Sequence, residues 1–206
     1  GRFSMESDLG SIKDASLLIE SGVIRWVGPE KDLSSHVIKS LVGKTHLEEI
    51  DCSGLTVLPA FVEAHTHTIF AGDRSAEWEQ KLCGMSYQAI AEKGGGILNT
   101  VHHTRIADET ELLELVKPRV QSFVKQGVGT LEIKSGYGLA FASEKKILQV
   151  ASRIKGPRIV RTYLGPHACP PEFEDADDYM NQIVENDLPE IVKASLAERA
   201  DIFIEK

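Results

Sequence analysis

The sequence of 206 residues is 42% hydrophobic and has 31 acidic against 23 basic side chains, which gives a net charge of -8. A mean hydropathy of -0.15 with a mixed composition excludes a disordered tail, and the acidic balance argues against nucleic-acid binding. No apolar run approaches the roughly 20 residues that cross a bilayer, and three widely separated cysteines favour a reducing compartment. We therefore expect a soluble, cytoplasmic globular protein.

The N-terminal part of the chain has the pattern of short strands separated by turns. Apolar runs at 15–19 and 23–27 with Gly22 at the bend between them predict a β-hairpin. Residues 55–62 are strongly apolar but contain Pro59, which a central strand rarely tolerates. We predict a short strand on each side of this proline.

From residue 108 onward the pattern alternates between helices and strands. Asp108 followed by Glu111 is typical of a capped helix start, and apolar residues then recur at helical spacing. The further expected elements are a strand at 128–133, a helix capped by Ser143, a strand at 159–164, a helical region at 175–199 broken near Pro189, and a strand at 201–204. Strand–helix–strand units of this kind predict a parallel sheet with right-handed crossovers.

Polar side chains recur where the expected strands end. They are His65, His67, Lys134, Tyr137, His167 and Glu205. In a (β/α)8 barrel the carboxyl ends of the strands form the rim on which active sites are built. Core packing does not explain polar residues repeated at one end of successive strands, so the pattern predicts an α/β barrel enzyme.

His65-Thr66-His67 is the sharpest motif in the chain. Residues two apart on a strand face the same side, so both imidazoles can point at one centre. Neutral imidazole is a common ligand for zinc and iron. The motif indicates a metal site, with two surface histidines near a strand end as the alternative.

Three other residues near this rim have competing interpretations. Arg74 has the guanidinium geometry to clamp a substrate carboxylate, or it pairs with Asp73 or Glu77. Tyr137 presents its hydroxyl to a ligand or packs under its loop. His167 is a metal ligand, a proton-transfer group or a substrate-binding residue.

Several segments match a known family in order along the chain. They are Leu58-Pro59-Ala60-Phe61-Val62-Glu63-Ala64-His65-Thr66-His67, Phe70-Ala71-Gly72-Asp73-Arg74, Gly94-Gly95-Gly96-Ile97, Thr104-Arg105, Lys134-Ser135-Gly136-Tyr137-Gly138 and Gly165-Pro166-His167-Ala168. On these segments the chain resembles the amidohydrolase superfamily and, within it, the imidazolonepropionase family. The His-x-His motif alone marks only the superfamily, whereas the ordered set is far more specific.

The resemblance implies a fold, an activity and roles for residues. Residues 1–58 would form part of a small β-sandwich domain, and 59–206 the first half of a (β/α)8 TIM-type barrel. The implied reaction is hydrolysis of the small molecule 4-imidazolone-5-propanoate to N-formimino-L-glutamate, in histidine degradation. His65 and His67 would bind one zinc or iron ion, and Arg74, Tyr137 and His167 would bind the substrate. Relatives of this kind are often homodimers.

The chain also departs from the pattern of this family. Ala60 and Glu63 stand where family members usually have Gly and Asp. Lys134 matches a lysine that other superfamily members carboxylate, but the resemblance is to the single-metal branch, so Lys134 is not assigned to metal. At a buried strand end it needs a partner or a modification.

The resemblance places further site residues beyond Lys206. They are a third histidine ligand, a catalytic Glu and an Asp ligand, and Glu205 does not replace that Glu. We therefore expect these 206 residues to be a fragment of the catalytic unit. The alternatives are another cyclic-amide or deaminating amidohydrolase, or a truncated product without catalysis.

Overall fold

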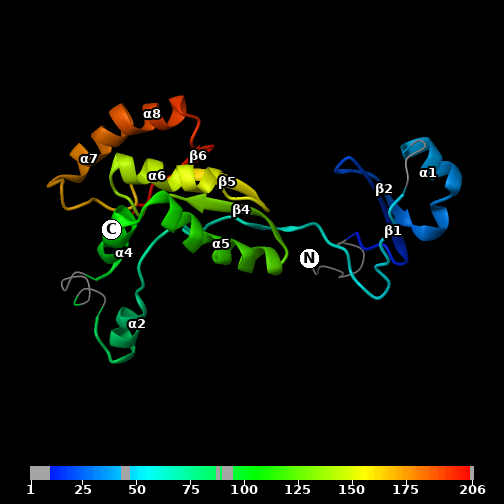
Figure 1. The fold of residues 1–206 in the computed structure, drawn as a ribbon, viewed down its shortest axis with the longest axis horizontal. Helices are drawn as coiled ribbons and strands as arrows, with labels where there is room; N and C mark the ends of the chain where they lie inside the picture. The colour runs from blue at the N-terminus through cyan, green and yellow to red at the C-terminus, as the bar shows by residue number, and fades with distance from the viewer. Residues whose placement is uncertain (1–9, 43–46, 87–88, 90–94, 205–206) are drawn as a thin grey trace, which may run out of the picture. The chain divides into compact units, whose positions relative to one another are not determined.

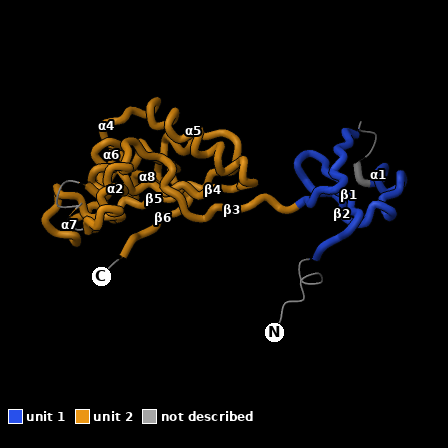
Figure 2. Tube along the Cα trace, turned by 90° about the horizontal axis from the view of Figure 1, so that it is seen from below, with its two compact units in different colours: residues 1–57 blue, residues 58–206 orange. Residues whose placement is uncertain are grey.

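The computed structural model describes residues 10–42, 47–86, 89 and 95–204, so the expectations for Gly94 and Glu205 lie outside the described residues. The chain divides into two compact units, Gly1–Val57 and Leu58–Lys206 (Figure 2). Within the described ranges, no helix combines the length and the apolar character needed to cross a membrane.

The smaller unit is built on the expected hairpin. Its elements are β1 (Ala15–Glu20), β2 (Val23–Pro29), the 3-10 turn η1 (Glu30–Asp32) and α1 (Ser35–Val42). β1 and β2 pair antiparallel, and Gly22 adopts a φ of 76° in the connecting turn, a conformation that glycine takes without steric cost. The hairpin prediction is confirmed. Over the described part of this unit the sheet has two strands, and the β-sandwich stays a prediction.

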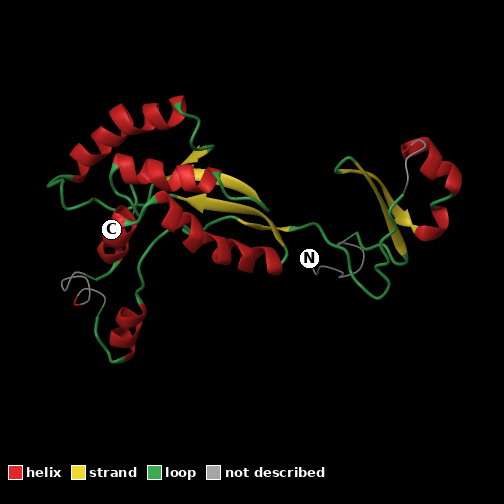
Figure 3. Cartoon of the chain, viewed as in Figure 1, coloured by secondary structure: helices red, strands yellow, loops and turns green. Residues whose placement is uncertain are grey.

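The larger unit is a four-stranded parallel sheet in the order β3-β4-β5-β6 with helices between its strands (Figures 1 and 3). Its strands are β3 (Phe61–Glu63), β4 (Val128–Lys134), β5 (Arg158–Tyr163) and β6 (Arg199–Ala200). Its helices are α2 (Ser75–Leu82), α4 (Ile97–Ile106), α5 (Glu109–Lys125), α6 (Phe141–Ser152), α7 (Ala176–Gln182), the π turn η2 (Ile183–Asp187) and α8 (Leu188–Lys193). The predicted alternation and parallel pairing are confirmed.

Helix α5 begins where its capping residues predict. The Asp108 carboxylate accepts a hydrogen bond from the backbone N–H of Glu111 at 2.8 Å, which satisfies one of the free donors of the first turn. Leu112, Val116 and Val120, four residues apart, form its fully buried face. The helix therefore presents one apolar stripe to the sheet.

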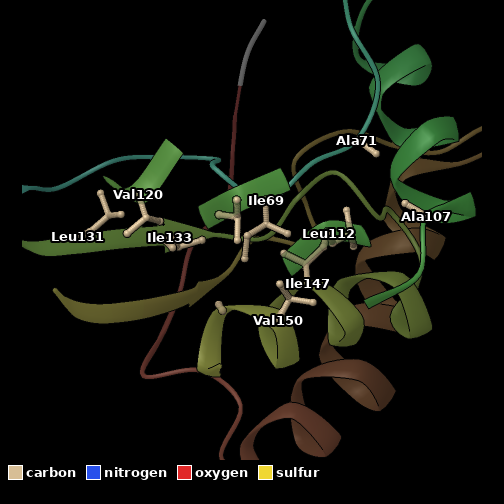
Figure 4. Close-up of a cluster of buried hydrophobic side chains, with 11 residues drawn as sticks. Ile69, Ala71, Ala107, Leu112, Val120, Leu131, Ile133, Ile147 and Val150 are labelled. Atoms are coloured by element: carbon tan, nitrogen blue, oxygen red, sulfur yellow. The ribbon is translucent and has the colours of Figure 1, made fainter. Parts of the chain in front are cut away.

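The core lies between β4 and the helices α5 and α6 (Figure 4). Leu131 and Ile133 of β4 are completely buried in it, together with Ile147 of α6. Burial of each such side chain contributes about 1.5–3 kcal/mol. Because side chains alternate along a strand, Glu132 and Lys134 point to the opposite face, where the polar groups of the site collect.

Two expected strands are wrong for the same reason. Residues 55–60 form no strand, because the first pair of the sheet joins Phe61 to Val128 and no strand of the described residues pairs with the chain before it. Residues 201–204 form no strand either, because β5 ends at Tyr163, which already pairs with Ala200. Apolar character alone does not make a strand where the ladder has ended.

Two expected helix boundaries also differ. Ser143 does not cap α6, which begins at Phe141 after an N-cap at Ala140. Near Pro189 the helical region at 175–199 changes from the π turn η2, which ends at Asp187, to α8, and this proline lies in the first turn of α8, where its missing N–H costs nothing. The region ends earlier than expected, at Lys193.

Candidate active site

Four of the predicted site residues meet just beyond the carboxyl ends of the strands. The ring centroid of His67 lies 5.5 Å from that of His65, 5.1 Å from that of Tyr137 and 4.6 Å from that of His167. β3 leads into the two histidines of the His-x-His motif, while Tyr137 follows β4 and His167 follows β5. The parallel order of the sheet thus brings residues of three distant segments into one cluster.

The hydrogen bond of His167 fixes its tautomer. Its Nδ1 lies 2.8 Å from the backbone carbonyl oxygen of Gly136, and because a carbonyl only accepts, Nδ1 carries the proton. In the neutral ring Nε2 is then a hydrogen-bond acceptor. The ring is also stacked on that of His67, with an interplanar angle of 7°. A ring nitrogen binds a metal ion in the plane of its ring, and the planes of two stacked rings run parallel without meeting. The arrangement therefore suits a substrate contact of His167 better than a metal ion shared with His67.

His67 has the properties of a neutral ligand. Burial, followed by the nearby imidazoles of His167 and His65, lowers the pKa of His67 to about 4. The ring is therefore uncharged at neutral pH, which is the form that binds metals. Its Nδ1 is buried and has no hydrogen-bond partner among the described residues.

The histidine pair satisfies the distance requirement for one shared ion. Two imidazole nitrogens about 2 Å from one zinc ion require ring centres within roughly 6 Å of each other, and the centroids of His65 and His67 are 5.5 Å apart. Across the described ranges no group of three or more His, Cys, Asp or Glu side chains could hold a metal. The residues present therefore fit part of a zinc or iron site.

Arg74 lies in the wall of a cavity next to this cluster. The cavity has a volume of about 410 Å³ and is lined by Phe70, Gly72, Asp73, Arg74, Thr100, Arg119 and Tyr137. Nε of Arg74 donates to Glu77 at 2.8 Å, so the expected pairing with Glu77 is observed. Its terminal Nη1 and Nη2 make no hydrogen bond to the described residues. The pairing orients Arg74 and leaves its bidentate edge for a ligand.

Glu77 ties together the segments around this cavity. It is buried in α2, and it also accepts hydrogen bonds from the backbone N–H of Gly96 at 3.1 Å and from Asn99 Nδ2 at 3.2 Å. Burial raises the pKa of Glu77, but the hydrogen bonds from Arg74, Asn99 and Gly96 outweigh this effect and leave the pKa below its ordinary value. Glu77 is therefore the anchor of Arg74.

Arg119 holds the backbone that follows the histidine pair. Its Nη1 donates to the carbonyl oxygens of Thr68 and Phe70, each at 2.8 Å. Its guanidinium carbon lies 3.7 Å from the ring centroid of Phe70, a cation–π contact. These long-range contacts from α5 hold the loop between His67 and Arg74 in place.

Lys134 finds protein partners at its buried strand end. Its Nζ lies 3.1 Å from Glu132 Oε1 and 2.9 Å from Asp201 Oδ2. Burial lowers the pKa of Lys134, but the hydrogen bonds and charges of these two carboxylates raise it above its ordinary value. Lys134 is therefore a cation held between two acids, which meets the need for a partner.

Arg119 and Glu144 were not among the site residues predicted from the sequence, and Glu77 was predicted only as an alternative partner of Arg74. Glu77 and Glu144 share one signal, since each is an acidic residue in the first turn of a helix. Acidic side chains there accept backbone N–H groups readily. Arg119 has no local signal, because its partners precede it by about 50 positions in the sequence.

Comparison with known proteins finds similar sequences along the whole chain. No family model matches the chain. Curated relatives named imidazolonepropionase do match: that of Bdellovibrio bacteriovorus is 48% identical over 206 residues, all of this chain and 48% of the relative. The chain is similar in sequence to proteins named imidazolonepropionase. That of Colwellia psychrerythraea is 43% identical, covering 95% of this chain and 47% of the relative, and that of Pseudomonas putida is 42% identical, covering 97% and 49%.

The imidazolonepropionase relationship extends along the whole sequence, because the matches cover 95% of this chain or more. The chain spans about half the length of the curated relatives it matches. Proteins named imidazolonepropionase are 41–48% identical to this chain, which supports the resemblance found from the motifs.

Proposed function

We propose that the protein hydrolyses 4-imidazolone-5-propanoate to N-formimino-L-glutamate, a step of histidine degradation. The observation that carries the proposal is the cluster of His65, His67, Tyr137 and His167 beside Arg74. It occurs in a chain 48% identical, over all 206 residues, to a protein named imidazolonepropionase. In this reaction water adds to the cyclic amide carbonyl and the ring carbon–nitrogen bond breaks.

His65 and His67 are the residues proposed to hold one zinc or iron ion. Their spacing and the neutral state of His67 support this assignment. Such an ion supplies a Lewis acid that polarises a carbonyl and activates water. Further ligands and the group that moves the proton are proposed to lie beyond the residues described above.

The substrate is proposed to bind between the cavity wall and the cluster. Arg74, held through Nε by Glu77, directs its two terminal nitrogens to the propanoate carboxylate, which matches their bidentate geometry. Nε2 of His167 accepts a ring N–H, because Nδ1 already donates to Gly136. Tyr137 lines the cavity together with Arg74, and its ring centroid lies 5.5 Å from that of His167. Binding at both ends orients the cyclic amide toward the histidine pair.

The same proposal extends to the architecture and the setting of the protein. The parallel sheet with helices between its strands supports the first half of a (β/α)8 barrel for 59–206, and the hairpin of β1 and β2 supports part of a small β-sandwich for 1–58. We further propose a cytoplasmic enzyme for a small molecule, without nucleic-acid or membrane partners, that forms a homodimer.

The experiment that tests this function is an assay of the full-length protein on 4-imidazolone-5-propanoate, followed by the loss of substrate absorbance. Conversion to N-formimino-L-glutamate, identified by mass, is the expected result. Hydrolysis of a dihydropyrimidine, or formation of a deaminated product, would instead favour another amidohydrolase. A protein that binds metal but converts none of these compounds would favour a non-catalytic role.

A further inference from the structure

Glu144 is an acidic side chain buried in the first turn of α6, with 1% of its surface exposed. Its carboxylate accepts hydrogen bonds from the backbone N–H groups of Gly136, Gly138 and Leu139, at 2.7, 2.6 and 2.7 Å. Burial raises the pKa of Glu144, while hydrogen bonds from Ser135 and from these three N–H groups lower it. Replacing a buried carboxyl group that accepts this many hydrogen bonds costs stability, because its backbone donors lose their partner.

The partners of Glu144 belong to one turn, 135–139, which follows β4 and carries Tyr137. The held N–H groups of Gly136 and Gly138 lie directly before and after Tyr137 in the sequence. Both positions require glycine: a Cβ on Gly136 would lie 2.8 Å from His167 Nδ1, and one on Gly138 would lie 2.6 Å from the backbone nitrogen of Glu144. The turn is therefore packed tightly against both Glu144 and His167.

Gly136 connects the buried acid to the histidine. Its N–H donates to Glu144 Oε2 at 2.7 Å, and its carbonyl oxygen accepts the proton of His167 Nδ1 at 2.8 Å. The N–H contact restrains this glycine, whose carbonyl in turn fixes the proton of His167. A chain of two hydrogen bonds thus runs from the buried carboxylate to the imidazole.

We propose that Glu144 is a positioning residue of the active site: through Gly136 it holds His167 in the Nδ1–H tautomer and fixes the turn that carries Tyr137. The consequence for catalysis rests on the proposed function, in which Nε2 of His167 accepts a ring N–H of the substrate. Without Glu144 the Gly136 carbonyl loses its orientation and Nε2 becomes protonated part of the time. A protonated Nε2 cannot accept that hydrogen bond.

The variant that tests this proposal is Glu144→Gln in the full-length protein. Glutamine keeps the shape, but its amide nitrogen is a donor and faces one of the three backbone N–H groups. The first measurement is the tautomer of His167 by nitrogen-15 NMR of labelled imidazoles, with His167→Asn to assign the signal. The second is the split between KM and kcat. Asp108→Asn is the matched control, since it makes the same carboxylate-to-amide change at the cap of α5.

The expected result is loss of the fixed Nδ1–H tautomer in Glu144→Gln and a rise in KM of about tenfold, with neither change in Asp108→Asn. A folded Glu144→Gln that keeps the tautomer and a KM within about twofold of wild type overturns the proposal. If Glu144→Gln does not fold, Glu144→Asp, which keeps the charge on a shorter side chain, decides by the same two measurements. If the wild type lacks the proposed activity, the tautomer still decides the role of Glu144.

Discussion

The imidazole rings of His67 and His167 lie parallel, with an interplanar angle of 7° and centroids 4.6 Å apart. This stacking separates their roles, since the ring of His67 also lies 5.5 Å from that of His65, while His167 is committed through Nδ1 to Gly136. His167 should therefore act on the substrate and not on the metal.

The substitution His167→Asn tests this separation. Asparagine can still donate to Gly136 but has no counterpart of Nε2, so one substrate hydrogen bond is lost. We expect kcat/KM to fall about 10- to 100-fold, the effect of losing about 1.5–3 kcal/mol, while the metal content stays that of wild type. The matched control is His102→Asn, a change at an exposed histidine. Loss of metal from His167→Asn would contradict the assignment.

Arg74→Lys tests recognition of the substrate carboxylate. Lysine keeps the charge but loses the bidentate fork and the Nε contact with Glu77. We expect kcat/KM on 4-imidazolone-5-propanoate to fall about 100-fold, and the difference from wild type to vanish on an analogue whose carboxylate is a neutral amide. Arg153→Lys, at an exposed ion pair with Glu109, is the control. An equal loss of kcat/KM on the substrate and on the amide analogue would show that Arg74 does not bind the carboxylate.

Much of the fold followed from local patterns. The hairpin of β1 and β2, the cap at Asp108, and the strands β4 and β5 depend on residues close together in the sequence. The strands expected at 55–58 and 201–204 failed because pairing depends on where the neighbouring strand begins or ends. No apolar run carries that information by itself.

The site was predictable where a residue carries its own chemistry. His65, His67, Tyr137 and His167 were identified from their types and positions, and the structure brings them together. The residues that hold them were not, because their contacts join distant segments: Lys134 meets Asp201 across 67 positions in the sequence. The long-range hydrogen bonds of a site appear only once the chain has folded.

The stability conferred by Glu77 should depend on pH. Its pKa in the fold lies below the ordinary value of 4.5, so its contribution is present above that value and is lost as the pH falls through the lowered pKa. We expect Glu77→Gln to lower the free energy of unfolding by about 1 kcal/mol at neutral pH and by less as the pH falls below the ordinary value of 4.5. Denaturant unfolding of both proteins at several pH values measures the difference. A difference that grows toward acid would contradict the lowered pKa.

The ion pair of Lys134 and Glu132 should be strongly coupled. Lys134→Met leaves the buried Glu132 carboxylate without its cation, which costs about 3 kcal/mol. The double variant Lys134→Met/Glu132→Gln removes the unpaired charge and should recover part of that loss. Chemical denaturation of wild type, both single variants and the double variant gives the coupling energy. Additive effects would show that the two charges do not stabilise each other.

The most direct test of the account is the rate of 4-imidazolone-5-propanoate hydrolysis by the full-length protein and by His65→Ala and His67→Ala, with bound zinc and iron measured on the same samples. We predict that the wild type is active with bound metal. Each variant should lose its metal and at least about 10³-fold in rate, since the metal supplies the polarisation of the carbonyl. Variants that retain both metal and rate would contradict the assignment of the histidine pair, and a metal-loaded wild type with no hydrolysis would contradict the proposed reaction.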